Sequence, residues 1–169
     1  SINDTLSVPG EKSITLPMGK INITRPVKSL NIILRTCMSV NMLTQSKKRI
    51  FEKDKEEYTK RTLISLINSV HYAKDFFKNV KFKVHIIDHN SSKNQISDIR
   101  IILEKSNLNF EKLNLKFEEF SNLIEKINEE KKEVTNNQKS NMSNIHQSLI
   151  LSKEACEDLT YFVEDDYIH

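Results

Sequence analysis

Short apolar runs alternate along this chain with longer segments in which apolar residues recur at helical spacing. Each run is short enough for a strand, and polar residues follow it. The predicted strands are Leu30–Leu34, Lys83–Ile87, Asn114–Phe117 and Leu159–Val163. The predicted helices cover about 47–77, Ile96–Lys105 and Ser143–Cys156. This alternation is typical of an α/β fold with a mainly parallel sheet and helices on both faces.

The apolar stripes also predict which side of a helix packs on the sheet. In the first helix the stripe comprises Leu63, Leu66, Ile67 and Val70 and continues toward Phe76 and Phe77, and in the last helix it comprises Ile145, Leu149 and Ala155. Residues 121–141 are polar and low in complexity, and we expect them to be poorly ordered or to project. Residues 1–29, punctuated by proline and glycine, are predicted to be an N-terminal extension to a domain of residues 30–169.

Composition narrows the class of protein. The net charge is +3, and basic and acidic residues are interleaved, so we expect no nucleic-acid partner. Cys37 and Cys156 lie far apart and indicate reduced thiols in a cytoplasmic protein. No apolar run approaches the length of a transmembrane segment. The chain opens on Ser1 and stops just after an acidic motif, which suggests a truncated fragment.

Polar clusters follow three of the predicted strands. They are Arg35-Thr36, the segment 88–92 (Asp-His-Asn-Ser-Ser) and the segment 164–166 (Glu-Asp-Asp). Ligands of parallel sheets bind beyond the carboxyl ends of the strands, and these clusters would meet at that edge. The convergence predicts a ligand site there.

The acidic cluster is a candidate metal site. Side chains two apart in an extended segment share a face, so Glu164 and Asp166 would point into one site while Asp165 points away. Carboxylate oxygens suit Mg²⁺ or Mn²⁺. The alternative is a polar turn that ends the strand. The histidines have no zinc-site spacing.

The second cluster is a candidate nucleotide contact. Asp88 ends a buried strand and could accept a hydrogen bond from a base N–H or a ribose hydroxyl. The alternative is a turn in which Asp and Asn side chains cap their own backbone. Arg35 is a weaker candidate, because an arginine at a strand end is usually a surface charge.

Four segments in order resemble GT-A glycosyltransferases, of the family 2-like nucleotide-diphospho-sugar transferases. They are 31–37 (NIILRTC), 62–69 (TLISLINS), 84–92 (VHIIDHNSS) and 162–166 (FVEDD). The last is similar to a Glu-Asp-Asp variant of that family's Asp-x-Asp motif. Glu164 and His89 depart from the commoner residues, and the segments 38–60 and 121–141 are insertions.

The resemblance implies a Rossmann-like three-layer sandwich that transfers a sugar from a nucleotide-diphosphate sugar to an acceptor, which the sequence does not identify. A divalent Mn²⁺ or Mg²⁺ would be held by Asp166, with Glu164 as a second ligand. A general base would lie beyond His169, in an acceptor half absent from this chain. The location would be cytoplasmic, with a peripheral position at the inner membrane as an alternative. The implied nucleotide-binding residues are Arg35, Thr36, Asp88, Asn90, Ser91 and Asp165.

Two other readings stay open. One is a different Mg²⁺-dependent phosphate-handling α/β enzyme, a nucleotidyltransferase or phosphohydrolase, although the chain has no glycine-rich phosphate loop. The other is a non-catalytic doubly wound domain used for assembly. That reading leaves the polar strand ends unexplained.

Overall fold

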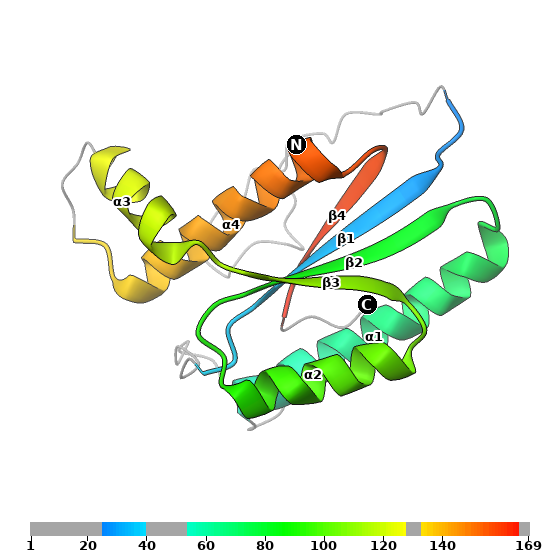
Figure 1. Cartoon of the computed structure of the whole chain (residues 1–169), viewed down its shortest axis with the longest axis horizontal. Coiled ribbons are helices and arrows are strands. Elements are labelled where there is room, and N and C mark those ends of the chain that lie inside the picture. The colour runs from blue at the N-terminus through cyan, green and yellow to red at the C-terminus, as the bar shows by residue number, and fades with distance from the viewer. Residues whose placement is uncertain (1–24, 40–53, 128–132, 166–169) are drawn as a thin grey trace, which may run out of the picture.

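The computed structural model describes residues 25–39, 54–127 and 133–165 (Figure 1). Four strands form a single sheet, all parallel, in the order β3-β2-β1-β4. The predicted α/β class and parallel sheet are therefore confirmed. In chain order the elements are β1 (Ser29–Thr36), α1 (Lys55–Phe76), β2 (Lys81–Asp88), α2 (Lys93–Lys105), β3 (Asn109–Asn114), α3 (Phe117–Ile127), α4 (Asn136–Ala155) and β4 (Leu159–Glu164).

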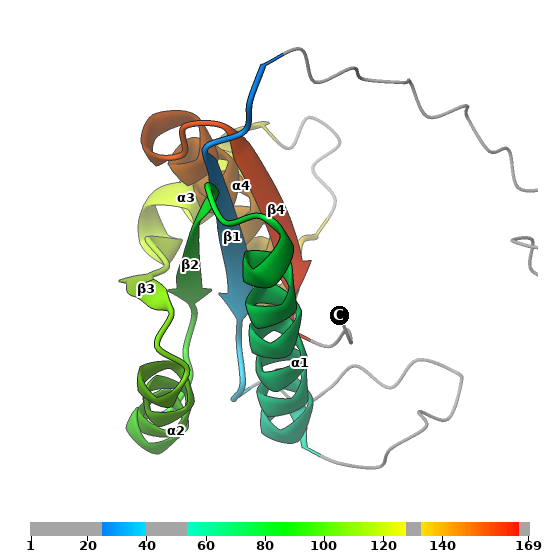
Figure 2. The ribbon, with the colours of Figure 1, turned by 90° about the vertical axis from the view of Figure 1, so that its right-hand side faces the viewer.

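Helices cover the sheet on both faces, which gives three layers consistent with a Rossmann-like fold (Figures 1 and 2). Because side chains alternate along a strand, β1 sends Ile32 and Leu34 to one face and Ile33 to the other. The first two pack with the apolar stripes of α1 and α2. The predicted stripe of α1 is wrong at its end, because Phe76 and Phe77 are exposed and the buried residues stop at Val70. Ile33 packs with Phe120 of α3. Burial on both faces explains why the central strands are continuous apolar runs.

The order of the strands reverses beside β1. The chain steps outward from β1 to β2 and β3, then returns through α3 and α4 to place β4 on the other side of β1. The carboxyl ends of β1 and β4 therefore flank a topological switch point, the usual ligand position in doubly wound sheets. Among the helices within the described ranges, none is long and apolar enough to cross a membrane.

The predicted position of the third strand is wrong. The strand covers Asn109–Asn114, and Phe117 instead begins α3. β3 lies at the edge of the sheet and is mostly exposed, so it carries little apolar pattern. Phe117, Phe120 and Ile124 recur at helical spacing and pack as one side of α3.

The segment 121–141 is also more regular than predicted. Its first residues complete α3, and residues 136–141 form the first turns of α4 behind a Thr135–Gln138 capping box. Residues 128–132 lie outside the described part of the chain. At the other insertion, residues 55–60 belong to α1, and residues 40–53 lie outside the described part of the chain.

The predicted inward face of α4 is wrong. Ile145 and Leu149 are 40% and 54% exposed, and Ala155 is exposed as well. The helix instead buries polar side chains against the sheet. Asn144 donates to the carbonyl of Ile87 at 3.1 Å. Gln147 likewise donates to the carbonyl of Asn114. The two amides satisfy backbone carbonyls at strand ends that would otherwise be buried without partners. The buried polar residues of α4 are Ser140, Ser143, Asn144, Gln147 and Ser148.

Candidate functional site

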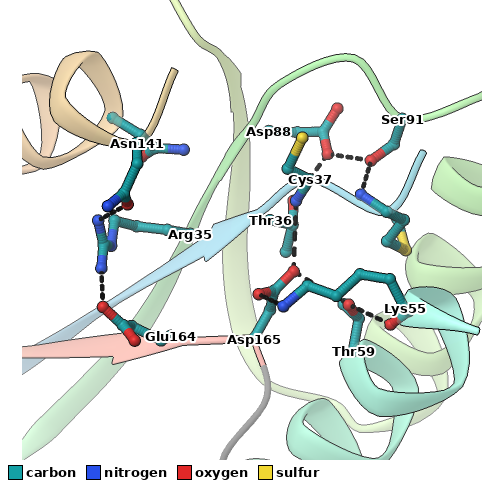
Figure 3. A network of polar contacts seen from close by, with 12 residues as sticks. Arg35, Thr36, Cys37, Lys55, Thr59, Asp88, Ser91, Asn141, Glu164 and Asp165 are labelled. Carbon is teal, nitrogen blue, oxygen red and sulfur yellow. Dashed lines mark hydrogen bonds and ion pairs between the residues drawn. The ribbon is translucent and has the colours of Figure 1, made fainter. Parts of the chain in front are cut away.

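The carboxyl ends of β1 and β2 are joined by a buried hydroxyl–carboxylate network (Figure 3). Thr36 and Ser91 both donate to Oδ1 of Asp88, at 2.7 and 2.6 Å. Ser91 Oγ in turn accepts the Met38 N–H at 3.0 Å. Asp88 is 6% exposed and Thr36 is 2% exposed. The network fixes the Asp88 carboxylate between β1 and the β2–α2 loop.

A second carboxylate, Asp165, lies just past β4 and is also buried. Its Oδ1 is 2.6 Å from the ammonium of Lys55, at the start of α1. Its Oδ2 is 3.0 Å from the Thr59 hydroxyl and accepts the Cys37 N–H at 3.3 Å. These contacts tie β4 to β1 and to the first turns of α1, as Figure 3 shows.

The opposite side of the same strand ends carries Arg35 and Glu164, which form an ion pair. Arg35 also donates to Oδ1 of Asn141 on α4, at 3.0 Å. The arginine side chain is 13% exposed and the glutamate side chain 51% exposed. Arg35 thus bridges β4 and α4 at the switch point.

His89 continues this α4-facing side beyond β2. Its Nδ1 is 2.6 Å from the Ser140 hydroxyl, and its ring stacks on Phe117 with centroids 4.6 Å apart. Burial lowers the pKa of His89, and the nearby Asp88 opposes that effect. The next residue, Asn90, has φ of 63°, a left-handed conformation that few residue types adopt easily. His89 and Asn90 therefore hold the β2–α2 loop in a defined, slightly strained shape.

A pocket of about 380 Å³ opens beside this loop. It is lined by residues 88–91, by Lys93 and Ile96 of α2, and by Lys112 and Asn114 of β3. The volume is within the range of small-ligand sites. One buried carboxylate and two lysines give it groups for both hydrogen bonding and anion binding.

Cys37 lies between the two buried carboxylates. Burial raises the pKa of its thiol to about 11, and the charges of Asp165 and Asp88 add to the effect. Lys55 acts in the opposite direction. A thiol with so high a pKa is mostly protonated at neutral pH and is a poor nucleophile.

The structure brings together most of the predicted site residues. Thr36, Asp88 and Ser91 share one network, Arg35 meets Glu164, and Asn90 lines the pocket. Glu164 and Asp165 lie on opposite sides of the strand end, as side-chain alternation predicted, and Asp165 is held against the end of β1. The roles of all these residues in nucleotide binding stay predictions.

The metal prediction depends on a residue that lies outside the described part of the chain, Asp166. Within the described ranges, no group of three or more His, Cys, Asp or Glu side chains could hold an ion. The carboxylates of Glu164 and Asp165 are already paired with Arg35 and Lys55. These two residues do not fit a metal site in this arrangement.

Several site residues were not predicted from sequence. Lys55 and Thr59 lie in a charged stretch where nothing local distinguishes them, and Ser140 and Asn141 lie in the segment expected to project. For Ser140 and Asn141, the one available signal was a capping box at Thr135, which predicts that the last helix starts before Ser143. To place Ser140 and Asn141 in the site, one would also need to know that the start of α4 packs against the carboxyl ends of the strands.

The site as a whole is the polar carboxyl edge of a doubly wound sheet, with acidic and basic side chains paired across the switch point. The pocket adjoins that edge, and its lining includes the buried carboxylate of Asp88 and the two lysines, Lys93 and Lys112. No protein-family model, no curated protein and no solved structure matches this chain.

Proposed function

We propose that this chain is the sugar-nucleotide-binding part of a glycosyltransferase with GT-A-like architecture. The observation that carries the proposal is the Asp88 network at the end of β2, next to the switch point and to a ligand-sized pocket. Burying a carboxylate is costly, and ligand recognition is a reason for a protein to keep one in place with two hydroxyls.

Asp88 would bind the nucleoside. Both protein hydroxyls bind its Oδ1, and no hydrogen bond from the described residues reaches Oδ2. Oδ2 would then accept a base N–H or a ribose hydroxyl from a nucleoside in the pocket. The contacts of Thr36 and Ser91 would hold the acceptor oxygen in place without a rearrangement on binding.

The diphosphate would extend toward the ends of β1 and β4. Transfer breaks the bond between the sugar and the diphosphate, and negative charge develops on the leaving phosphate oxygens. Fixed positive groups stabilise such charge. Arg35, held by Asn141 and Glu164, is a cation already oriented at that edge. Because Glu164 is paired with Arg35 and Asp165 with Lys55, Mg²⁺ or Mn²⁺ would have to be held through Asp166, where it would supply Lewis-acid chemistry.

Thermal unfolding with ligands tests this proposal. A nucleoside diphosphate together with Mn²⁺ should raise the melting temperature more than either component alone, because a ligand that binds only the folded state stabilises it. Inorganic diphosphate with Mn²⁺ is the matched control, since it lacks the nucleoside. If the diphosphate control stabilised the protein equally, the nucleoside role of Asp88 would be excluded.

A second candidate function is favoured by the two lysines of the pocket. Lys93 and Lys112 could bind a phosphate group there, as in an enzyme that handles a phosphorylated small molecule rather than a sugar nucleotide. In that case Lys93→Gln and Lys112→Gln would each weaken phosphate binding, and a nucleoside without phosphate would not compete. Under the glycosyltransferase proposal, the nucleoside would compete for the pocket.

A further inference from the structure

The far end of α1 carries an exposed aromatic cluster that the site does not use. Tyr72, Phe76 and Phe77 are 68%, 65% and 58% exposed. The rings of Tyr72 and Phe76 contact each other with centroids 4.8 Å apart. We call these three residues the aromatic patch. Three large rings left in water within six residues mark a surface that binds something apolar.

Lysines lie close to the aromatic patch along the chain. Residues 71–81 contain three lysines and one aspartate, Asp75, which is 3.3 Å from Lys78. Lys74 and Lys81 are exposed, and so is Lys28, whose carbonyl accepts the Lys81 N–H at 2.8 Å. Asp158 lies beside Lys28, accepts its N–H at 2.7 Å and pairs with Arg25, so Lys28 and Lys81 keep positive charge where β1 and β2 begin.

Rings and lysines together favour a lipid surface over a protein partner. Lysine is depleted in protein–protein interfaces, whereas aromatic rings flanked by lysine are typical of segments at a membrane surface. The rings enter the headgroup region, and the ammonium groups remain with anionic lipid phosphates. We propose that the aromatic patch and its lysines dock this protein on an anionic bilayer. This proposal is independent of the proposed function.

The fold also sets the position of the site relative to the bilayer. α1 begins at Lys55, beside Asp165, and ends at Phe76 at the opposite edge of the sheet (Figure 1). A helix of 22 residues spans about 33 Å. Docking through the aromatic patch would thus leave the polar edge facing the solvent, and nucleotide affinity should be the same with and without vesicles.

Flotation with lipid vesicles tests the proposal. The chain should float with vesicles of phosphatidylcholine mixed with phosphatidylserine, should not float with pure phosphatidylcholine, and should be released by high salt. The variant Tyr72→Gln/Phe76→Gln/Phe77→Gln should lower the partition coefficient at least about tenfold. The variant Met142→Gln/Ile145→Gln/Leu149→Gln, which removes three exposed apolar residues of α4, is the matched control and should float like the wild type.

A charge variant keeps the test valid if the aromatic variant folds poorly. Lys74→Gln/Lys81→Gln should weaken flotation, while Lys116→Gln/Lys153→Gln, which removes the same charge elsewhere, should not. Three outcomes would overturn the proposal: no flotation with anionic vesicles, equal loss in a variant and its matched control, or light scattering showing that the aromatic variant dissociates a wild-type oligomer. The last would identify the patch as a protein interface.

Discussion

Neighbouring carboxylates at the end of β4 should differ sharply in their contribution to stability. Asp165 and Lys55 have side chains only 10% and 16% exposed, and Asp165 also binds the Thr59 hydroxyl and the Cys37 N–H. Breaking a buried pair costs about 3–5 kcal/mol. Asn keeps one acceptor oxygen, so Asp165→Asn should cost about 3 kcal/mol, the lower end of that range. For a chain of this length, that loss lowers the melting temperature by about 6–12 °C.

Glu164→Gln is the matched control, since it removes one charge at the adjacent position. The Glu164 side chain is 51% exposed, so its pair with Arg35 is screened by water and its loss should cost about 0–1 kcal/mol. Urea unfolding followed by circular dichroism measures both free energies of unfolding. Equal losses in the two variants, or a wild-type stability for Asp165→Asn, would refute the assignment of Asp165 to the buried side.

Three further predictions concern single residues. Burial and the charge of Lys83 lower the pKa of His85, so the unfolded chain takes up its proton at a higher pH. Stability should therefore fall as the pH drops below about 6.5, and His85→Gln should flatten the pH profile of the melting temperature; a profile unchanged by His85→Gln would contradict this. Because the pKa of Cys37 is about 11, iodoacetamide should alkylate it at pH 8 roughly a hundredfold more slowly than free cysteine, and an equal rate would show an accessible thiolate. Asn90→Ala should cost about 1–2 kcal/mol at the left-handed position while Asn90→Gly costs less, and urea unfolding should reveal that order.

Three of the four strands were predicted close to their observed positions, and two of these, β1 and β2, are buried on both faces. β1 and β2 read as continuous apolar runs because both sides of each pack against helices. β4 lies at one edge of the sheet and is mostly exposed, yet its run of apolar residues made it predictable. β3, at the other edge, lacks such a run, and its position was predicted wrongly. The inward face of α4 was predicted wrongly because the amides of Asn144 and Gln147 on that face donate to backbone carbonyls at the ends of β2 and β3. Hydrophobic periodicity cannot detect an interface of that kind.

Topology, more than any motif, made the candidate site predictable. Parallel strands bring their carboxyl ends to one edge, so residues 35–36, 88–92 and 164–165 had to converge there. Side-chain alternation correctly separated Glu164 from Asp165. The partner of each carboxylate was not predictable, because Lys55 lies more than a hundred residues from Asp165 along the chain and meets it only through the packing of α1.

Calorimetric titration with a panel of nucleoside diphosphates tests the central claim most directly. Wild-type protein should bind at least one of them, and Asp88→Asn should bind it at least about tenfold more weakly, because a hydrogen bond to a charged group is worth about 1.5–3 kcal/mol. Asn keeps an oxygen for Thr36 and Ser91, so the fold should survive. Asp98→Asn, on the exposed pair with Lys60, should bind like the wild type. Equal affinity in Asp88→Asn and the wild type, or binding of no nucleoside diphosphate, would contradict the account.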